Sequence, residues 1–132
     1  MEWVLQGQDS CCFVYAAANV LVYEAKPVPN LEPIKDIACC RHGATIHTTK
    51  VLEALGLSLR RTDQAEDVFR NGGILTIHHP IFNLHSVFVA PQQSGRVLAV
   101  NSFLGPTAFS LEPEVLARFL PKAHLSRHYA RN

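Results

Sequence analysis

Residues 6–24 read QGQDSCCFVYAAANVLVYE, a polar loop followed by a long apolar segment. Asp9 or Ser10 can cap a helix from about Cys11 to Glu24, because their side-chain oxygens accept hydrogen bonds from the free N–H groups of a first helical turn. Apolar residues occupy almost every side of this helix, and such a helix is expected to be buried inside a domain. The segment therefore predicts a central helix around which the rest of the chain packs.

The remaining chain changes from helical spacing to short apolar runs of strand length. The basic tail after residue 121 is expected to be a solvated end. A turn sequence at residues 92–95 predicts an antiparallel hairpin, and helices followed by a strand meander indicate an α+β fold. We expect further helices over residues 31–40, 45–55, 64–70 and 113–120, and strands over 57–59, 74–78, 86–90 and 96–102.

Length and charge exclude several classes of protein. The chain has 132 residues, which predicts one domain over residues 1–132. Hydrophobic residues make up 48% and charged residues 17%, a balance typical of globular rather than disordered chains. A net charge of +1 argues against a nucleic-acid binder, and the longest apolar run, residues 13–22, is too short to span a bilayer. The first residues, MEWV, lack the basic start of a secretory signal, so we expect a cytoplasmic protein without membrane or nucleic-acid partners.

The four cysteines form two adjacent pairs, Cys11–Cys12 and Cys39–Cys40. The CxxC spacing typical of structural zinc sites is absent. A chain of this length can build a core without cross-links, so we expect reduced thiols rather than a disulfide framework.

The seven histidines do not show a metal-ligand pattern. His78 and His79 are adjacent on an expected strand, so their side chains point to opposite faces. His42 and His47 lie near the second cysteine pair, but at no spacing typical of a metal site. We therefore expect no metal and no cofactor.

Cys12 falls in the first turn of the predicted central helix. Free N–H groups and the helix dipole favour an anion there, which makes a thiolate available as a nucleophile. The alternative for Cys12 alone is a small core residue. Gln6 lies six residues upstream, and its side-chain amide can donate a hydrogen bond to an oxyanion formed beside the sulfur.

Two polar residues fall at the ends of the predicted hairpin strands. His85 opens one strand and Asn101 closes the next, so pairing about the 92–95 turn brings them together. A histidine at a strand mouth can act as a general base, although a histidine among apolar residues is more often part of the core. The Asn101 side chain can then hold the imidazole in orientation.

Three motifs resemble those of papain-like cysteine proteases. Gln6-Gly7-x4-Cys12-Phe13 resembles the nucleophile segment, His85-Ser86-Val87 the histidine segment, and Asn101-Ser102-Phe103 the family's Asn-Ser-Trp. The resemblance implies a papain-like fold in which the buried N-terminal helix carries the nucleophile.

The resemblance also implies a role for each matched residue. Cys12 would be the nucleophile, with Gln6 and the Cys12 N–H forming the oxyanion hole. His85 would be the base and then the acid, oriented by Asn101, and Phe103 would shield the Asn–His hydrogen bond. Cys11 competes for the nucleophile role, but the spacing from Gln6 and the aromatic residue that follows select Cys12.

The short chain is most similar to compact bacterial members of this family. These include leader peptidases attached to bacteriocin exporters and protease effectors or toxins delivered by specialised secretion systems. Asp9 stands where papain-type enzymes often carry a disulfide cysteine. The resemblance implies a protein or peptide substrate and, for a toxin, an immunity or inhibitor protein as partner. Two alternatives remain: glutamine deamidation or transglutamination on the same residues, and a binding module that keeps the fold without catalysis.

Overall fold

The computed structural model describes residues 2–7, 9–40, 45, 47–80, 83–105, 107–122 and 128–132. The described helices are α1 (Cys12–Tyr23), α2 (Glu32–Ala38), α3 (Thr48–Ala54), α4 (Ala65–Asn71) and α5 (Pro113–Ala117). The strands are β1 (Leu59–Thr62), β2 (Gly73–His79), β3 (Asn83–Pro91), β4 (Val97–Val100), β5 (Ala108–Leu111) and β6 (His128–Arg131). All neighbouring strands pair antiparallel, in the order β1-β6-β2-β3-β4-β5.

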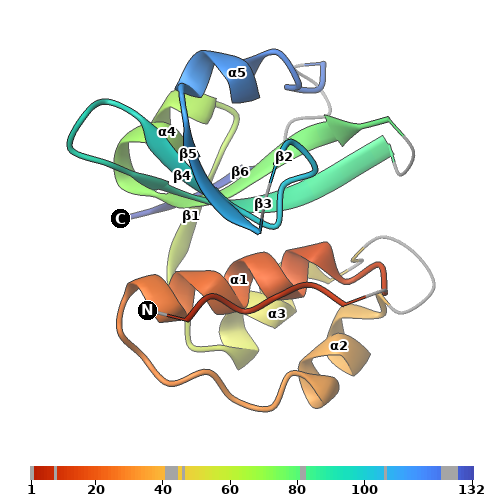
Figure 1. The fold of residues 1–132 in the computed structure, drawn as a ribbon. Helices are drawn as coiled ribbons and strands as arrows, with labels where there is room; N and C mark the ends of the chain where they lie inside the picture. The colour runs from red at the N-terminus through yellow and green to blue at the C-terminus, as the bar shows by residue number, and fades with distance from the viewer. Residues whose placement is uncertain are drawn as a thin grey trace.

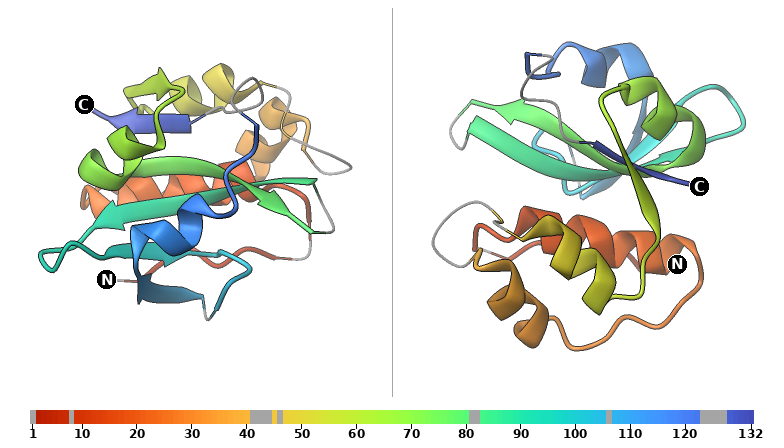
Figure 2. Two further views of the ribbon diagram at one scale, coloured as in Figure 1. Left: turned by 90° about the horizontal axis from the view of Figure 1, so that it is seen from above. Right: turned by 180° about the vertical axis from the view of Figure 1, so that it is seen from behind.

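The sheet separates two groups of helices (Figure 1, Figure 2). Helices α1, α2 and α3 lie on one side, and α1 packs directly against β2 and β3. Helices α4 and α5 cover the other side, where Val68 and Leu116 join a second apolar cluster. Every residue of α1 from Phe13 to Leu21 is buried, as its apolar sequence predicted. The expected α+β class, with a buried N-terminal helix on an antiparallel sheet, is confirmed.

The β3–β4 hairpin forms about the expected turn. Gln92 donates its N–H to the Arg96 carbonyl at 2.9 Å, and Phe88 lies opposite Val100 in the register. Residue 101 follows β4 directly, so the hairpin brings it beside the start of β3. The hairpin therefore positions the two polar residues that the sequence analysis singled out.

The prediction of a solvated C-terminal tail is wrong for its last residues. His128, Tyr129 and Ala130 are buried in β6, which pairs with β1 and β2. Gly73 permits this pairing, because a Cβ there would overlap the Tyr129 carbonyl oxygen. Strand β5 was also missed, and β1 begins where residues 57–59 were expected to end. The sequence did not indicate β6 because this strand has only four residues, two of them histidine and arginine, and so shows little alternation of apolar and polar residues.

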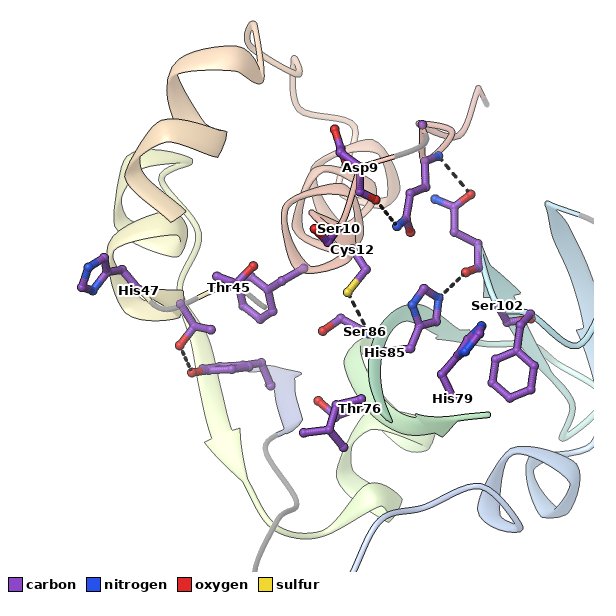
Figure 3. A pocket seen from close by; sticks show the side chains of 18 of the residues that line it. Asp9, Ser10, Cys12, Thr45, His47, Thr76, His79, His85, Ser86 and Ser102 are labelled. Atoms are coloured by element: carbon purple, nitrogen blue, oxygen red, sulfur yellow. Dashed lines mark hydrogen bonds between the residues drawn. The ribbon is translucent and has the colours of Figure 1, made fainter. Parts of the chain in front are cut away.

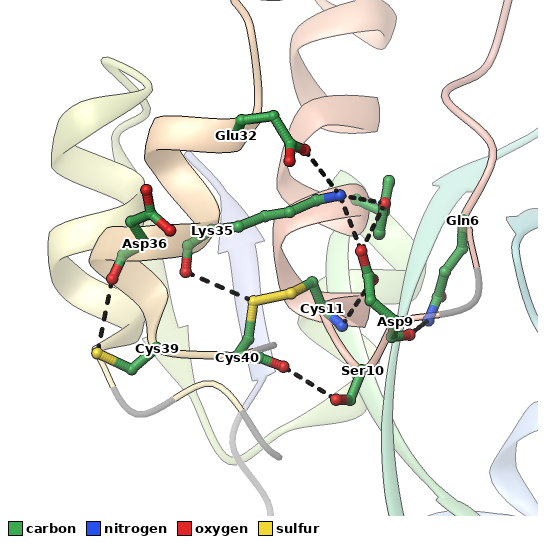
Figure 4. Close-up of a disulfide and its surroundings, with 10 residues drawn as sticks. Gln6, Asp9, Ser10, Cys11, Glu32, Lys35, Asp36, Cys39 and Cys40 are labelled. Atoms are coloured by element: carbon green, nitrogen blue, oxygen red, sulfur yellow. Dashed lines mark hydrogen bonds and ion pairs between the residues drawn. A yellow bond between two sulfur atoms is a disulfide. The ribbon is translucent and has the colours of Figure 1, made fainter. Parts of the chain in front are cut away.

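The expectation of reduced thiols is wrong for one residue of each cysteine pair. Cys11 and Cys40 form a disulfide with their Cα atoms 5.1 Å apart (Figure 4). The chain turns at Cys39, whose left-handed φ of 58° ends α2 and brings the next residue against the start of α1. The length of the chain did not predict whether a disulfide forms, because Cys11 and Cys40 are brought together by the packing of α2 beside α1. Cys12 and Cys39 keep free thiols, so Cys11 no longer competes as a nucleophile.

Among the described residues, no helix is both long enough and apolar enough to cross a bilayer.

Candidate active site

A cleft of about 1100 Å³ lies between the α1 layer and the sheet. Gln6, Cys12, His85 and Asn101 all line it, although they come from a loop, a helix start and two strand ends. Figure 3 shows Cys12 and His85 on facing sides of this cleft. The structure therefore brings the four predicted site residues together.

Cys12 is the first residue of α1 and is half-buried. The Ser86 backbone N–H donates to its Sγ at 3.4 Å, and Figure 3 shows the sulfur directed at the His85–Ser86 segment of β3. The free N–H groups of the first helical turn also favour negative charge. The sulfur, the atom through which cysteine attacks carbonyl carbon, therefore lies at the start of the helix and faces the sheet.

Several contacts fix the loop that leads to Cys12 (Figure 4). Asp9 accepts the Cys11 N–H at 3.1 Å, and Ser10 donates its hydroxyl to the Cys40 carbonyl at 2.9 Å. Lys35, which is almost fully buried, donates to Asp9 at 2.8 Å. Sequence analysis missed this lysine, because an amphipathic pattern gives no sign that a charged residue is paired inside.

The Asp9 carboxylate is held in its charged form. Burial raises its pKa, but hydrogen bonds from Lys35, the Cys11 N–H and the Tyr15 hydroxyl outweigh burial and leave the pKa below its ordinary value. The hydrogen bond to Asp9 in turn raises the pKa of Lys35. The helix start is therefore tied to α2 by an ion pair as well as by the disulfide.

His85 is held by a backbone oxygen. Its Nε2 lies 2.7 Å from the Asn101 carbonyl oxygen. A carbonyl only accepts hydrogen bonds, so Nε2 carries the proton and Nδ1 is left to accept one. Burial lowers the pKa of His85, and the bond to the Asn101 carbonyl opposes this only in part. The ring is therefore neutral at neutral pH, as a general base must be.

Asn101 occupies the expected place but contacts the imidazole through a different atom. The sequence analysis assigned its side chain to His85, whereas that side chain accepts the Gln6 N–H at 3.3 Å and donates to the Val4 carbonyl at 2.9 Å. Its φ of 61° turns the backbone so that the carbonyl meets the imidazole. Asparagine tolerates this left-handed conformation better than most residues.

Gln6 points its amide toward the same loop. Its Nε2 donates to the Asp9 carbonyl at 3.4 Å, at the long end of hydrogen-bond distance. A bond of this length is readily exchanged for a stronger one to an oxyanion. Together with the Cys12 N–H, the Gln6 amide can supply the two donors of an oxyanion hole.

His79 lines the cleft, although from the sequence it was considered only as a metal ligand. Its ring lies 5.6 Å from the His85 ring and 4.6 Å from the Phe103 ring, measured between centroids. Strand alternation was predicted correctly, since His78 is exposed and His79 lines the cleft. The alternation of side chains along paired β2 and β3 also places His79 on the same face of the sheet as His85. The sequence could have indicated this only if the pairing of these two strands had been known. Burial, followed by the charges of His85 and His78, lowers the pKa of His79. Phe103 packs against His79, where the sequence analysis expected it to shield the Asn–His bond.

No group of three or more potential metal ligands occurs within the described ranges. His42, one of the histidines considered near the second cysteine pair, lies outside those ranges.

The fold is similar to that of one solved structure, the peptidase domain of Streptococcus ComA, a bi-functional ABC transporter involved in a quorum-sensing pathway. The match has a TM-score of 0.75 and covers 98% of this chain and 97% of that one, with 12% sequence identity. No protein-family profile matches the chain, and no curated protein shows significant sequence similarity to it. The structural match confirms the α+β fold, with a buried N-terminal helix on an antiparallel sheet, that was expected from the sequence.

Proposed function

We propose that the protein is a cysteine peptidase that cleaves a protein or peptide through an acyl-enzyme intermediate. The observation that carries the proposal is the bond from His85 Nε2 to the Asn101 carbonyl, beside a Cys12 sulfur that accepts the Ser86 N–H. This arrangement leaves Nδ1 of a neutral imidazole without a hydrogen-bond partner among the described residues, in the cleft that the thiol faces. A thiol and a free base in one cleft are the minimum for thiolate attack.

Acylation begins when His85 Nδ1 takes the Cys12 proton. The sulfur then attacks the peptide carbonyl carbon, and the negative charge on the carbonyl oxygen is stabilised by the Gln6 amide and the Cys12 N–H. The C–N bond breaks as His85 returns its proton to the leaving amine, which leaves a thioester on Cys12. Water, deprotonated by His85, attacks the thioester, releases the carboxylate product and restores the thiol.

The structural neighbour supports peptide hydrolysis over other amide chemistry, because it is a peptidase domain with nearly complete mutual coverage. An open cleft of about 1100 Å³ also suits an extended peptide. Deamidation and transglutamination use the same first step and differ only in which amide enters and what attacks the thioester.

The biological setting belongs to the same proposal and rests on the sequence resemblance to compact bacterial proteases. In that setting the protein is an effector or toxin domain that acts in the cytoplasm or is delivered into a target cell. An immunity or inhibitor protein would then cover the cleft until delivery.

The test is digestion of a complex peptide mixture in ¹⁸O-labelled water, analysed by mass spectrometry. Peptide hydrolysis incorporates one labelled oxygen into each new carboxyl terminus. Deamidation instead converts glutamine to glutamate without a new terminus, and transglutamination joins an added amine. We expect labelled termini with the natural protein and a rate lower by about three orders of magnitude or more for Cys12→Ala or His85→Ala.

Cys39→Ala is the matched control, because Cys39 is the other free thiol and lies exposed outside the cleft. This variant should cleave at the natural rate. Labelled termini that persist in Cys12→Ala would refute the mechanism. Glutamine conversion or amine addition without labelled termini would assign one of the alternatives, and no reaction of any kind would favour a binding module.

A further inference from the structure

The end of the cleft formed by α3, β1 and β6 carries two positive charges. Lys50 comes from α3 and Arg61 from β1; both line the cleft and both are exposed. Neither forms an ion pair with a carboxylate of the described residues. Two free cations at one end of a cleft are open to a negatively charged ligand.

The two cations reach the cleft from opposite walls. Arg61 lies directly opposite Tyr129 in the β1–β6 register, so both side chains emerge on the same face of the sheet. The Tyr129 hydroxyl lies 2.7 Å from Thr48 Oγ1, which joins the sheet to the first turn of α3. Lys50 follows two residues later on that helix. The hydrogen-bonded hydroxyl pair and the two cations therefore come from the same three elements, α3, β1 and β6, and all four residues line the cleft.

The hydroxyl pair is held rigidly in place. Tyr129 is buried, and its ring packs edge-on against Phe13 of α1 with centroids 5.5 Å apart. A fixed tyrosine and threonine offer preorganised partners for a carboxylate that the two cations attract.

The charge at this end is not compensated within the cleft. Asp9 is the only carboxylate among the described residues that line it, and Lys35 already pairs with Asp9 at 2.8 Å. The opposite end of the cleft is lined by His79, Leu84 and Phe103, which form an aromatic and apolar wall. The cleft is therefore positive on one side of Cys12 and apolar on the other.

We infer that Lys50 and Arg61 select peptide substrates with a glutamate or aspartate side chain on one side of the scissile bond. The inference rests on the proposed peptidase function and adds a substrate class to it. Arg61 supplies a planar guanidinium that can bind a carboxylate through two hydrogen bonds, and Lys50 supplies a second charge across the cleft. A chain-terminal carboxylate has the same chemistry, so the experiment separates the two sources.

The experiment starts from a C-terminally amidated peptide that the protein cleaves in the mixture digestion. Glutamate and glutamine versions are compared at each of the four positions on either side of the cleaved bond, and kcat/KM is measured at low and high salt. We expect glutamate to be favoured at one position by about three- to tenfold at low salt, chiefly through KM, with a smaller preference at high salt. A version with a free carboxyl terminus serves as the second arm.

Arg61→Gln and Lys50→Gln should each reduce that preference, and the double variant should abolish it. The double charge reversal, Lys50→Glu with Arg61→Glu, should favour lysine at the same position. Arg70→Gln is the matched control, since Arg70 is exposed on α4 across the sheet from the cleft and should leave the preference unchanged.

Equal cleavage of glutamate and glutamine versions at every position would overturn the inference, while cleavage itself would leave the proposed function standing. A preference that survives in the double glutamine variant, or that Arg70→Gln removes equally, would also overturn it. If only the peptide with a free carboxyl terminus were cleaved faster, Lys50 and Arg61 would bind the terminal carboxylate of a substrate and not an acidic side chain.

Discussion

Removal of the Cys11–Cys40 disulfide by the double substitution Cys11→Ala/Cys40→Ala should destabilise the fold by a calculable amount. The bridge joins residues 29 apart in sequence. Closing a loop of that length removes about 12 cal/mol/K of conformational entropy from the unfolded chain, which corresponds to about 3.6 kcal/mol at 25 °C. A chain of this size has a total stability of roughly 7–20 kcal/mol, so the variant should remain folded but lose a substantial part of its stability.

The assay is equilibrium unfolding in urea, followed by fluorescence and circular dichroism, for the natural protein and the double variant. The natural protein is also measured in the presence of a reductant. Reduction should lower its free energy of unfolding by a similar amount and leave the double variant unchanged. The slope of the transition should rise in the variant, because the cross-linked unfolded chain of the natural protein exposes less surface than the open chain of the variant. Alkylation before and after reduction should count two and then four reactive thiols in the natural protein.

A loss below about 1 kcal/mol with two thiols counted before reduction would refute the entropic argument, since the bridge would be present but would not constrain the unfolded chain. Four thiols before reduction would refute the bridge itself. Cys11 immediately precedes Cys12, so the double variant should also lose part of its peptidase activity. The ion pair between Lys35 and Asp9 would still hold the loop to α2.

Two other predictions concern the interior histidine of β6 and the asparagine of the site. His128 accepts the Thr76 N–H at 3.0 Å, and burial lowers its pKa from the ordinary 6.5, so the unfolded chain takes up its proton first as the pH falls. Stability should therefore decrease as the pH falls below about 6.5, by at most about 1.4 kcal/mol per pH unit for this group. His128→Gln should show a smaller dependence of the free energy of unfolding on pH in urea titrations across about pH 5–7, and an unchanged dependence would refute the prediction. Asn101→Ala should lower kcat/KM less than His85→Ala does, because the carbonyl that holds the imidazole is retained; an equal loss in steady-state kinetics would show that the side chain does more.

The sequence predicted which residues meet in the site better than it predicted which atoms meet. The approach of His85 to Asn101 follows from hairpin register, which a turn and two apolar runs determine. The use of the Asn101 carbonyl follows from a backbone φ of 61°, and no sequence pattern reports that angle. Local sequence patterns therefore predicted that His85 and Asn101 lie close together, but not that the Asn101 carbonyl is the atom that binds the imidazole.

Features that depend on distant packing were the ones missed. The Cys11–Cys40 bridge requires α2 to lie beside the start of α1, and the two segments are joined by a long irregular stretch whose path the sequence does not reveal. Strand β6 comes from the C-terminal end of the chain, and it can pair with β2 only because residue 73 is a glycine, which has no Cβ to overlap the Tyr129 carbonyl oxygen. Both features are determined by tertiary packing, which outweighs the structural preference of the local sequence.

The segment before α1 shows how the site is assembled without regular secondary structure. Asn19 is fully buried in an otherwise apolar helix, which would be costly without partners. Its amide accepts the Val4 N–H at 2.6 Å and donates to the Val4 carbonyl at 3.1 Å, while Asn101 donates to the same carbonyl. One residue of the N-terminal segment is thus held by α1 and by the residue after β4. Gln6, the expected oxyanion donor, lies two residues after Val4, and its own N–H donates to the Asn101 side chain. The contacts of Val4 and Asn101 therefore position Gln6, His85 and the nucleophile helix relative to one another.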